Sequence, residues 1–171
     1  SALGTIASSS EGLISFVQSY RSLTHIAAPV RKAFYLKDLV NDSVTIAQTN
    51  WPSASVSYHE LSEDIILYAD FGQISQVMNN LIKNAVQAGA SEIDITASID
   101  KRERTVINVA NNGEPISETG KEQIFVPFYT TKGDSGTGVG LSLCRQIIRL
   151  NGGTINLTSS TAESTVFTIV L

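Results

Sequence analysis

The feature that most restricts the fold of this chain is a stretch at residues 70–89 with the periodicity of one amphipathic helix. Its apolar residues recur every three or four positions and predict a buried stripe of Ile74, Val77, Met78, Leu81, Ile82, Ala85 and Ala88. Asp70 is placed to cap the first turn, Gln73 to reach back in a capping box, and Gly89 to follow the last turn in a left-handed conformation. The rest of the chain has to be arranged around this helix.

The opposite face of the same helix is rich in side-chain amides. It carries Gln73, Gln76, Asn80, Lys83, Asn84 and Gln87. Asn80 and Asn84 are four residues apart and stack one turn above the other. Asparagine is a poor helix former, because its amide competes for nearby backbone groups. Two interpretations stay open at this point: a solvent-exposed face, or neutral oxygen ligands for a hard cation that already carries phosphate.

The remaining sequence is long enough to build one main domain around this helix. The chain has 171 residues, of which 42% are apolar and 16% charged, and its formal net charge of −4 gives no reason to expect a nucleic-acid partner. A single cysteine, Cys144, excludes an internal disulfide and a multi-cysteine metal site. No stretch approaches the roughly 18 apolar residues that a membrane-spanning helix needs.

The order of the periodic segments predicts an α+β fold. Helical patterns occur at residues 1–25, where the helix is expected to begin partway along because of the serine run, and at 37–48, 70–89 and 141–150. Strand patterns occur at 54–61, 65–68, 92–99, 105–110, 155–157 and 166–171. We therefore expect a two-layer α/β sandwich with one mixed, mostly antiparallel sheet covered on one face by helices.

Two glycine-bearing segments point to ligand binding. In VANNGEPI (109–116), Gly113 permits a tight turn and the Asn111 side chain can face a planar ligand, although the segment alone predicts only a turn. In GDSGTGVGL (133–141), glycines lead into a helix whose first N–H groups have no partner, as in phosphate-binding sites. A Walker A motif is excluded by its missing Lys-Ser or Lys-Thr, and a Rossmann fold is disfavoured because no strand precedes the glycines.

Four motifs together resemble the N, first glycine, F and second glycine boxes of sensor histidine kinases of two-component systems. In the order of that family they are QVMNNLIKNA (76–85), NNGEPI (111–116), FVPFYTTK (125–132) and GTGVGL (136–141). The resemblance covers roughly residues 34–171. It implies the catalytic ATP-binding domain of that family (HATPase_c, of the GHKL group) with the Bergerat sandwich, ATP and Mg²⁺ as ligands, and transfer of a phosphoryl group to histidine.

The resemblance also implies roles for the matched residues. Asn80 and Asn84 would hold Mg²⁺ against the triphosphate and Lys132 would add positive charge, which makes these three the catalytic candidates. Residues 125–135 would form a lid over the nucleotide. The implied nucleotide-binding residues are Asn84, Gln87, Asn111, Gly113, Ile116, Phe125, Thr130, Thr131, Lys132, Gly136, Thr137, Gly138, Val139, Gly140 and Leu141.

Two positions depart from the family pattern. Asn111 stands where an aspartate usually accepts a hydrogen bond from the adenine amino group, and Pro115 stands where a second glycine is usual. The amide oxygen of asparagine can accept the same hydrogen bond, but the missing charge is expected to weaken adenine binding or to loosen base selectivity.

The chain offers no convincing phosphoacceptor of its own. His59 precedes Glu-Leu as in the family's acceptor motif, but it lies at the end of a predicted strand without the usual proline, and His25 lacks an acidic neighbour. We therefore expect residues 1–28 to be a partial arm of the dimerisation hairpin with its linker, and 34–171 to be the catalytic domain. The alternative is an N-terminal helix packed on its own domain.

Partners and location follow from the same resemblance. It implies the dimerisation domain of the same protein, a homodimer, a response regulator receiver domain and no nucleic acid. It places the domain in the cytoplasm and leaves open whether the parent protein is anchored in the inner membrane. The competing functions are an anti-sigma serine kinase of the same fold and a nucleotide sensor without transfer.

Overall fold

The computed structural model describes residues 2–131, 133 and 136–171. Its helices are α1 (Ala2–Thr24), α2 (Leu36–Asn50), α3 (Phe71–Gln87), α4 (Glu118–Gln123) and α5 (Gly140–Leu150). Its strands are β1 (Lys32–Tyr35), β2 (Ser55–Glu60), β3 (Ile66–Ala69), β4 (Glu92–Ile99), β5 (Thr105–Asn111), β6 (Thr154–Ser160) and β7 (Thr165–Val170).

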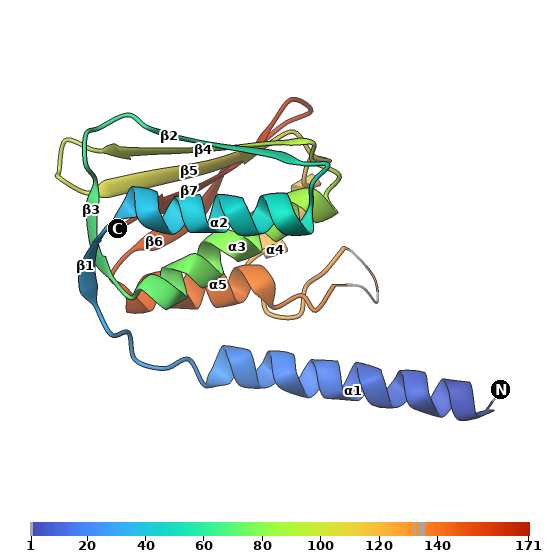
Figure 1. Ribbon diagram of the computed structural model, residues 1–171. Helices are drawn as coiled ribbons and strands as arrows, with labels where there is room; N and C mark the ends of the chain where they lie inside the picture. Colours follow the sequence, from blue (N-terminus) through green and yellow to red (C-terminus); the bar gives the residue numbers. More distant parts are fainter. Residues whose placement is uncertain (1, 132, 134–135) are drawn as a thin grey trace.

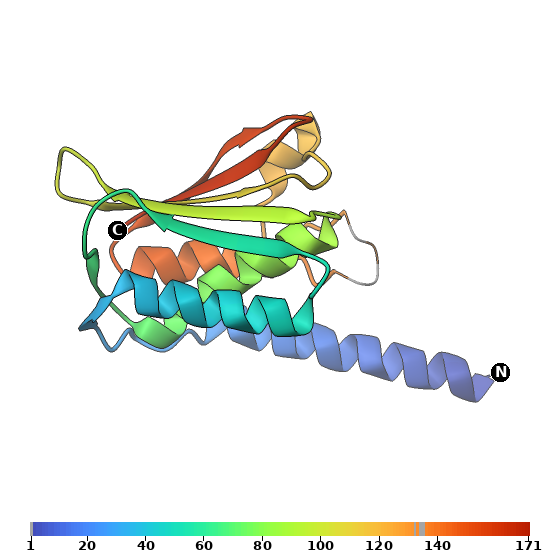
Figure 2. The same ribbon diagram turned by 45° about the horizontal axis from the view of Figure 1, so that its top comes forward.

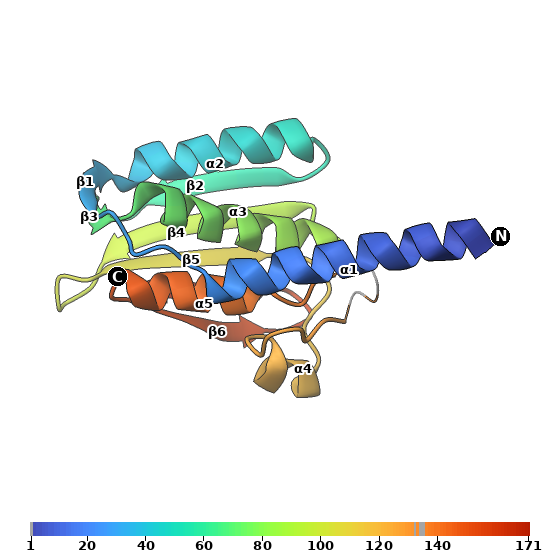
Figure 3. The same cartoon turned by 90° about the horizontal axis from the view of Figure 1, so that it is seen from below.

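The main sheet has five strands in the order β2-β4-β5-β7-β6 (Figure 1). Strand β2 runs parallel to β4, and the other neighbours are antiparallel. Helices α2, α3 and α5 lie side by side over one face of this sheet (Figure 3), and α4 lies beside the ends of β6 and β7 (Figure 2). The predicted α+β sandwich with a mixed, mostly antiparallel sheet is thus confirmed.

The expectation of a single sheet needs correction, because β1 and β3 pair antiparallel in a separate two-stranded sheet. Between β2 and β3 the chain turns through Asp64, whose φ is +45°. Leu67 in β3 is buried, and Leu36 at the start of α2 donates its N–H to the Ile65 carbonyl at 2.9 Å. Burial of Leu67 and this hydrogen bond hold β3 against the start of α2 and away from the main sheet.

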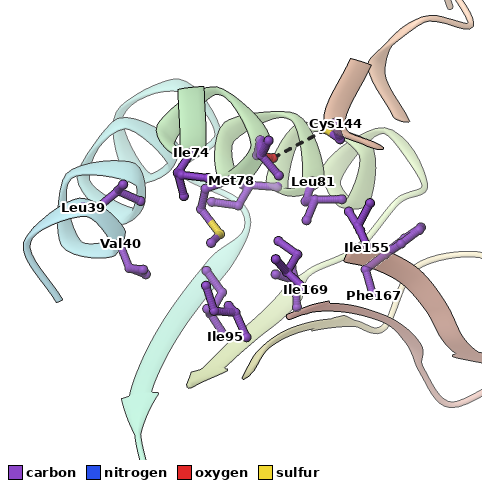
Figure 4. Packing of buried hydrophobic residues seen from close by; sticks show 14 of the residues in the cluster. Leu39, Val40, Ile74, Met78, Leu81, Ile95, Cys144, Ile155, Phe167 and Ile169 are labelled. Carbon is purple, nitrogen blue, oxygen red and sulfur yellow. Dashed lines mark hydrogen bonds between the residues drawn. The ribbon is translucent and has the colours of Figure 1, made fainter. Parts of the chain in front are cut away.

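The core lies between the helices and the main sheet (Figure 4). Of the predicted stripe on α3, every residue except the partly exposed Ala88 is buried. This stripe faces Ile95, Phe167 and Ile169 of the sheet and the buried side chains of α2, which include Leu39 and Val40. Full burial of each large aliphatic side chain contributes about 2 kcal/mol. Burial of the stripe therefore fixes the rotation of α3 about its own axis, and this determines the direction in which the amide-bearing face points.

The predicted start of α3 is confirmed in part. The Asp70 carboxylate accepts a hydrogen bond from the Gln73 N–H at 3.0 Å, and Gly89 follows the helix with a φ of +80°. The capping box is wrong, because the Gln73 side chain donates to the Ala27 carbonyl at 2.8 Å and does not reach back to Asp70. The Asp70 N–H donates instead to Asn151 Oδ1 at 2.9 Å.

Helix α1 extends along the far side of the helical layer from the sheet (Figures 1 and 3). It runs through the serine run unbroken, contrary to expectation, and the Ser10 hydroxyl donates to the Ile6 carbonyl one turn earlier. None of its residues, all of which are described, is buried. Its Phe16 ring stacks on Phe128 with 5.1 Å between ring centroids. No helix in the described ranges is long and apolar enough to cross a membrane.

The linker after α1 is fastened to the sandwich by polar contacts. The Val30 N–H donates to Asp70 Oδ2 at 2.8 Å, and the Arg31 guanidinium donates to the Leu150 carbonyl at 2.6 Å. These contacts join the linker to the first turn of α3 and the last turn of α5.

Candidate nucleotide-binding site

A cavity of about 640 Å³ opens between the C-terminal half of α3, the turn after β5, the segment before α5 and strand β7. Its volume is typical of small-molecule sites. It is lined by Asn80, Lys83, Asn84, Ala85, Gln87, Ala88, Asn111, Glu114, Pro115, Ile116, Ser117, Gly120, Ile124, Tyr129, Thr130, Thr131, Gly136, Thr137, Gly138, Gly140, Leu141, Thr165 and Phe167.

The wall formed by α3 presents the predicted amides. Asn80, Asn84 and Gln87 all line the cavity, because the buried stripe on the other side of the helix turns them toward it. A Cβ atom added to Gly140 would lie 3.9 Å from Asn80 Oδ1. The α3 amides and the first turn of α5 are thus close enough to contact one ligand.

Asn80 also contacts the side chain of Cys144 in α5. Burial raises the pKa of the Cys144 thiol to about 12, and a hydrogen bond with the Asn80 side chain opposes this shift. Cys144 therefore remains a neutral thiol, and its contact with Asn80 fixes the amide against α5.

The glycine loop forms the facing wall. Gly138 has a φ of +66°, and a Cβ atom there would lie 2.5 Å from the Phe128 carbonyl carbon, so only glycine fits. The Phe128 N–H donates to the Gly138 carbonyl at 2.7 Å. Helix α5 starts at Gly140, and the first N–H groups of a helix lack partners within it and lie at its positive end. This wall is suited to bind phosphate oxygens.

The other end of the cavity has a polar floor. Asn111, 7% exposed, accepts a hydrogen bond from the Gly113 N–H at 3.0 Å through Oδ1 and donates to the Thr165 carbonyl through Nδ2 at 3.5 Å. The Thr165 hydroxyl lies 2.7 Å from that of Ser160, which accepts from the Ile116 N–H at 2.9 Å. This network fixes the Asn111 amide, and its oxygen keeps a second acceptor position.

Three predicted residues do not line the cavity, and Lys132 lies outside the described residues. Gly113 packs behind the floor, where a Cβ atom would lie 2.9 Å from the Ala88 carbonyl oxygen. Phe125 packs edge-on against Phe167, with 6.3 Å between ring centroids, and Phe167 lines the cavity in its place. Val139 is buried in the core. These three residues shape the cavity from behind.

No sequence motif indicates the lining residues from β7. Thr165 and Phe167 reach the cavity because they pair with Asn111 and Val109 of β5. Only knowledge of the β5–β7 register would have identified them. Several other lining residues were also not predicted. Lys83, Glu114, Pro115, Ser117, Ile124 and Tyr129 lie in or beside the motifs, and Gly120 lies in α4 between two of them.

Neither histidine lines this cavity within the described part of the chain. His25 Nδ1 lies 2.8 Å from the Thr24 hydroxyl, and His59 Nε2 lies 3.8 Å from Asp94 on the sheet. No group of three or more His, Cys, Asp or Glu residues is clustered among residues 2–131, 133 and 136–171. A metal bound in the cavity would therefore be held by amide oxygens together with oxygens of the ligand.

Residues 69–171 match the family described as histidine kinase-, DNA gyrase B- and HSP90-like ATPase. The sensor histidine kinase ZraS of Escherichia coli (strain K12) is 32% identical over 152 residues, which are 86% of this chain and 32% of ZraS. Sporulation kinase D of Bacillus subtilis (strain 168) is 31% identical over 140 residues, 80% of this chain and 28% of that kinase. The chain thus spans about a third of the length of these relatives.

Solved structures agree with the sequence match. The catalytic domain of histidine kinase ThkA is 34% identical, with a TM-score of 0.73 over 82% of this chain and 94% of that domain. ThkA in complex with the response regulator protein TrrA is 27% identical, with a TM-score of 0.77 over 99% of this chain and 50% of that chain. The chain therefore belongs to the histidine kinase-, DNA gyrase B- and HSP90-like ATPases, and within them to the catalytic ATP-binding domains of sensor histidine kinases.

Proposed function

We propose that this domain binds Mg²⁺-ATP and transfers the γ-phosphoryl group to a histidine of a dimerisation domain outside this chain. In this transfer the bond between the γ-phosphorus and the leaving ADP oxygen breaks, a phosphorus–nitrogen bond forms on the imidazole, and the ring proton passes to water. The observation that carries the proposal is the approach of the α3 amide wall, at Asn80, to the start of α5, at Gly140.

The site residues act by position and charge. Phosphoryl transfer depends mainly on alignment and on neutralisation of the phosphate oxygens. The N–H groups at the start of α5 would hold the phosphates, and Asn111 would accept a hydrogen bond from the base through its free acceptor position. The loop at Gly138 is fixed by its hydrogen bond to Phe128, which keeps the phosphate-binding wall in place.

Asn80 and Asn84 are the proposed metal-holding residues. Mg²⁺ would supply positive charge that offsets the charge of the phosphates. Two amide oxygens on successive turns fit a cation that takes most of its ligands from phosphates and water. The position of Asn80 beside Gly140 supports this assignment, since the same ligand would reach both.

We further propose that residues 1–28 are part of the dimerisation hairpin with its linker, and 34–171 the catalytic domain. Helix α1 has no buried residue and exposes Leu3, Ile6, Leu13, Ile14, Phe16, Val17 and Tyr20. The isolated ThkA catalytic domain aligns with 82% of this chain, whereas the longer ThkA chain aligns with 99%. Both observations support a role for the N-terminal helix outside the catalytic domain. We propose that this role is in a homodimer, which signals to a response regulator receiver domain from the cytoplasm.

Transfer of labelled phosphate tests the proposal. The chain is mixed with [γ-³²P]ATP, Mg²⁺ and a separately produced hairpin fragment that carries the acceptor histidine. We expect label on the fragment that is labile in acid, as for phosphohistidine, and none when the acceptor histidine is replaced by alanine. Tight ATP binding without any transfer would contradict kinase activity and favour a nucleotide sensor. Acid-stable label would favour a serine kinase.

A further inference from the structure

We infer that Lys83 is a specificity-determining residue, which binds the polyphosphate tail and selects nucleotides by the number of their phosphates. This inference rests on the proposed function and extends it to a residue outside the matched asparagines and glycines. It follows from the place of Lys83 on α3, from the charges around the cavity, and from the contacts of its side chain.

Lys83 lies on the same side of α3 as the amides. At about 100° per residue it is offset by roughly 60° from Asn80 and by roughly 40° from Gln87 around the helix axis. All three residues line the cavity. Lys83 follows Asn80, the amide that approaches Gly140, by three residues, which is about one helical turn.

The described part of the cavity lining carries a positive and a negative side chain at different levels along the axis of α3. Among the lining residues that the structure describes, Lys83 is the only cation and Glu114 the only carboxylate. The Glu114 N–H donates to the carbonyl of Ala88, about a turn and a half beyond Lys83 along α3. A ligand with a neutral base and an anionic tail would therefore be oriented with its tail toward Lys83. Because the whole chain carries a net charge of −4, this local charge matters for a polyanion.

The ammonium group of Lys83 is not neutralised by another described residue. Its side chain is exposed, and it forms no hydrogen bond or ion pair with any residue in the described ranges. Lys37 and Lys121 differ, because each is paired with a carboxylate, Asp64 and Glu118 respectively. Lys83 therefore keeps its donors for a ligand in the cavity, and a contact with phosphate replaces only water.

Calorimetric titration with AMP, ADP and ATP in the presence of Mg²⁺ tests this role. Removal of one cation from a phosphate contact is expected to weaken ATP binding to Lys83→Met about tenfold, ADP binding less, and AMP binding not at all. Lys83→Arg should stay within about twofold of the unmodified chain, because it keeps the charge. Lys37→Met is the matched control, since it removes the same charge away from the cavity, and its affinities should not change.

Salt provides a second measurement. An exposed charge contact is screened, so the difference between the unmodified chain and Lys83→Met should shrink as ionic strength rises. Thermal unfolding of the two proteins should coincide, because Lys83 is exposed and unpaired with other described residues.

Three outcomes would overturn the assignment. They are equal ATP affinity for Lys83→Met and the unmodified chain, an equal loss for AMP and ATP, or a loss in Lys83→Arg as large as in Lys83→Met. In each of them the unmodified chain still binds ATP, so the proposed function stands. An unmodified chain that bound none of the three nucleotides would refute both proposals.

Discussion

The two ends of α3 use the same kind of side chain for different purposes. At the N-terminal end, the Gln73 amide donates to the Ala27 carbonyl at 2.8 Å and accepts from Asn151 Nδ2 at 2.9 Å. Both the nitrogen and the oxygen of this amide are thus used in hydrogen bonds within the fold. At the C-terminal end, Asn80 and Asn84 line a cavity. The two ends lie on one face of one helix, yet one end fastens the linker and the other forms a candidate ligand site.

The difference comes from the partner that the fold brings to each end. Asn151, at the end of α5, meets the first turn of α3, whereas Gly140, at the start of α5, meets its third turn. A bulky polar residue closes one end, and a glycine without a side chain leaves the other open. The function of an amide on a helix face is therefore decided by a residue distant in the sequence.

The largest effect is expected from Asn84→Ala at the open end. Loss of a proposed metal-holding oxygen should weaken Mg²⁺-ATP binding by about 100-fold or more, while the domain stays folded because Asn84 is outside the core. Calorimetry measures the affinity and circular dichroism the fold. Gln76→Ala is the matched control, because Gln76 is an exposed amide on the same helix that does not line the cavity. Unchanged affinity would remove Asn84 from the site.

Asn151→Ala at the closed end should give the opposite pattern. It removes hydrogen bonds to Asp70 N–H, to Gln73 Oε1 and to the Ile147 carbonyl from a residue that is 7% exposed. Stability should fall by about 2–3 kcal/mol, measured by urea unfolding, with Mg²⁺-ATP affinity at 25 °C preserved. The exposed Asn156 serves as the control for Asn→Ala replacement. A loss of affinity in the folded variant would show that the two ends are not independent.

A smaller effect is expected from Gln73→Ala, at about 1 kcal/mol, because Gln73 is partly exposed and makes only part of the network. Its combination with Asn151→Ala should be less destabilising than the sum of the two single changes by about 0.5–1 kcal/mol, since they share one hydrogen bond. A double-mutant cycle of unfolding free energies measures this coupling. Strict additivity would mean that the Gln73–Asn151 bond does not contribute.

The smallest effect is the pH dependence of the closed end. Hydrogen bonds from the Gln73 and Val30 N–H groups lower the pKa of Asp70 below its usual 3.8. A lowered pKa in the folded state stabilises the fold above the usual value, and this stabilisation is lost as the pH falls through the lower, folded-state pKa. The difference in melting temperature between the unmodified chain and Asp70→Asn should thus be constant from about pH 5 to 7. Below about pH 4 the unmodified chain should lose stability relative to Asp70→Asn. A difference independent of pH down to pH 2 would contradict the assignment.

Local signals predicted much of this molecule. The α3 stripe, the Asp70 cap, Gly89 and the β4–β5 hairpin were all identified, because each depends on residues close in the sequence. The separate β1–β3 sheet, the use of Gln73 by the linker and the lining residues of β7 were missed, because each depends on a partner far along the chain.

The site shows the same division. The amides of α3 and the glycines before α5 carry their geometry in the local sequence, so they were identified as candidates. Gly113 and Val139 were predicted to bind the ligand, but they lie behind the cavity lining. A motif indicates that the backbone turns there, but it does not indicate which side of the turn faces the cavity.

The aromatic stack between Phe16 and Phe128 has a practical consequence for the choice of fragment boundaries. Phe128 has a φ of +66°, and its N–H donates a hydrogen bond to the Gly138 carbonyl. The Phe16 ring therefore covers the residue that supports the glycine loop. A protein that starts after Thr24 would keep every cavity residue and yet expose that phenyl ring to water. Nucleotide affinities measured on such a shortened protein would describe a glycine loop whose supporting residue, Phe128, is no longer covered by α1.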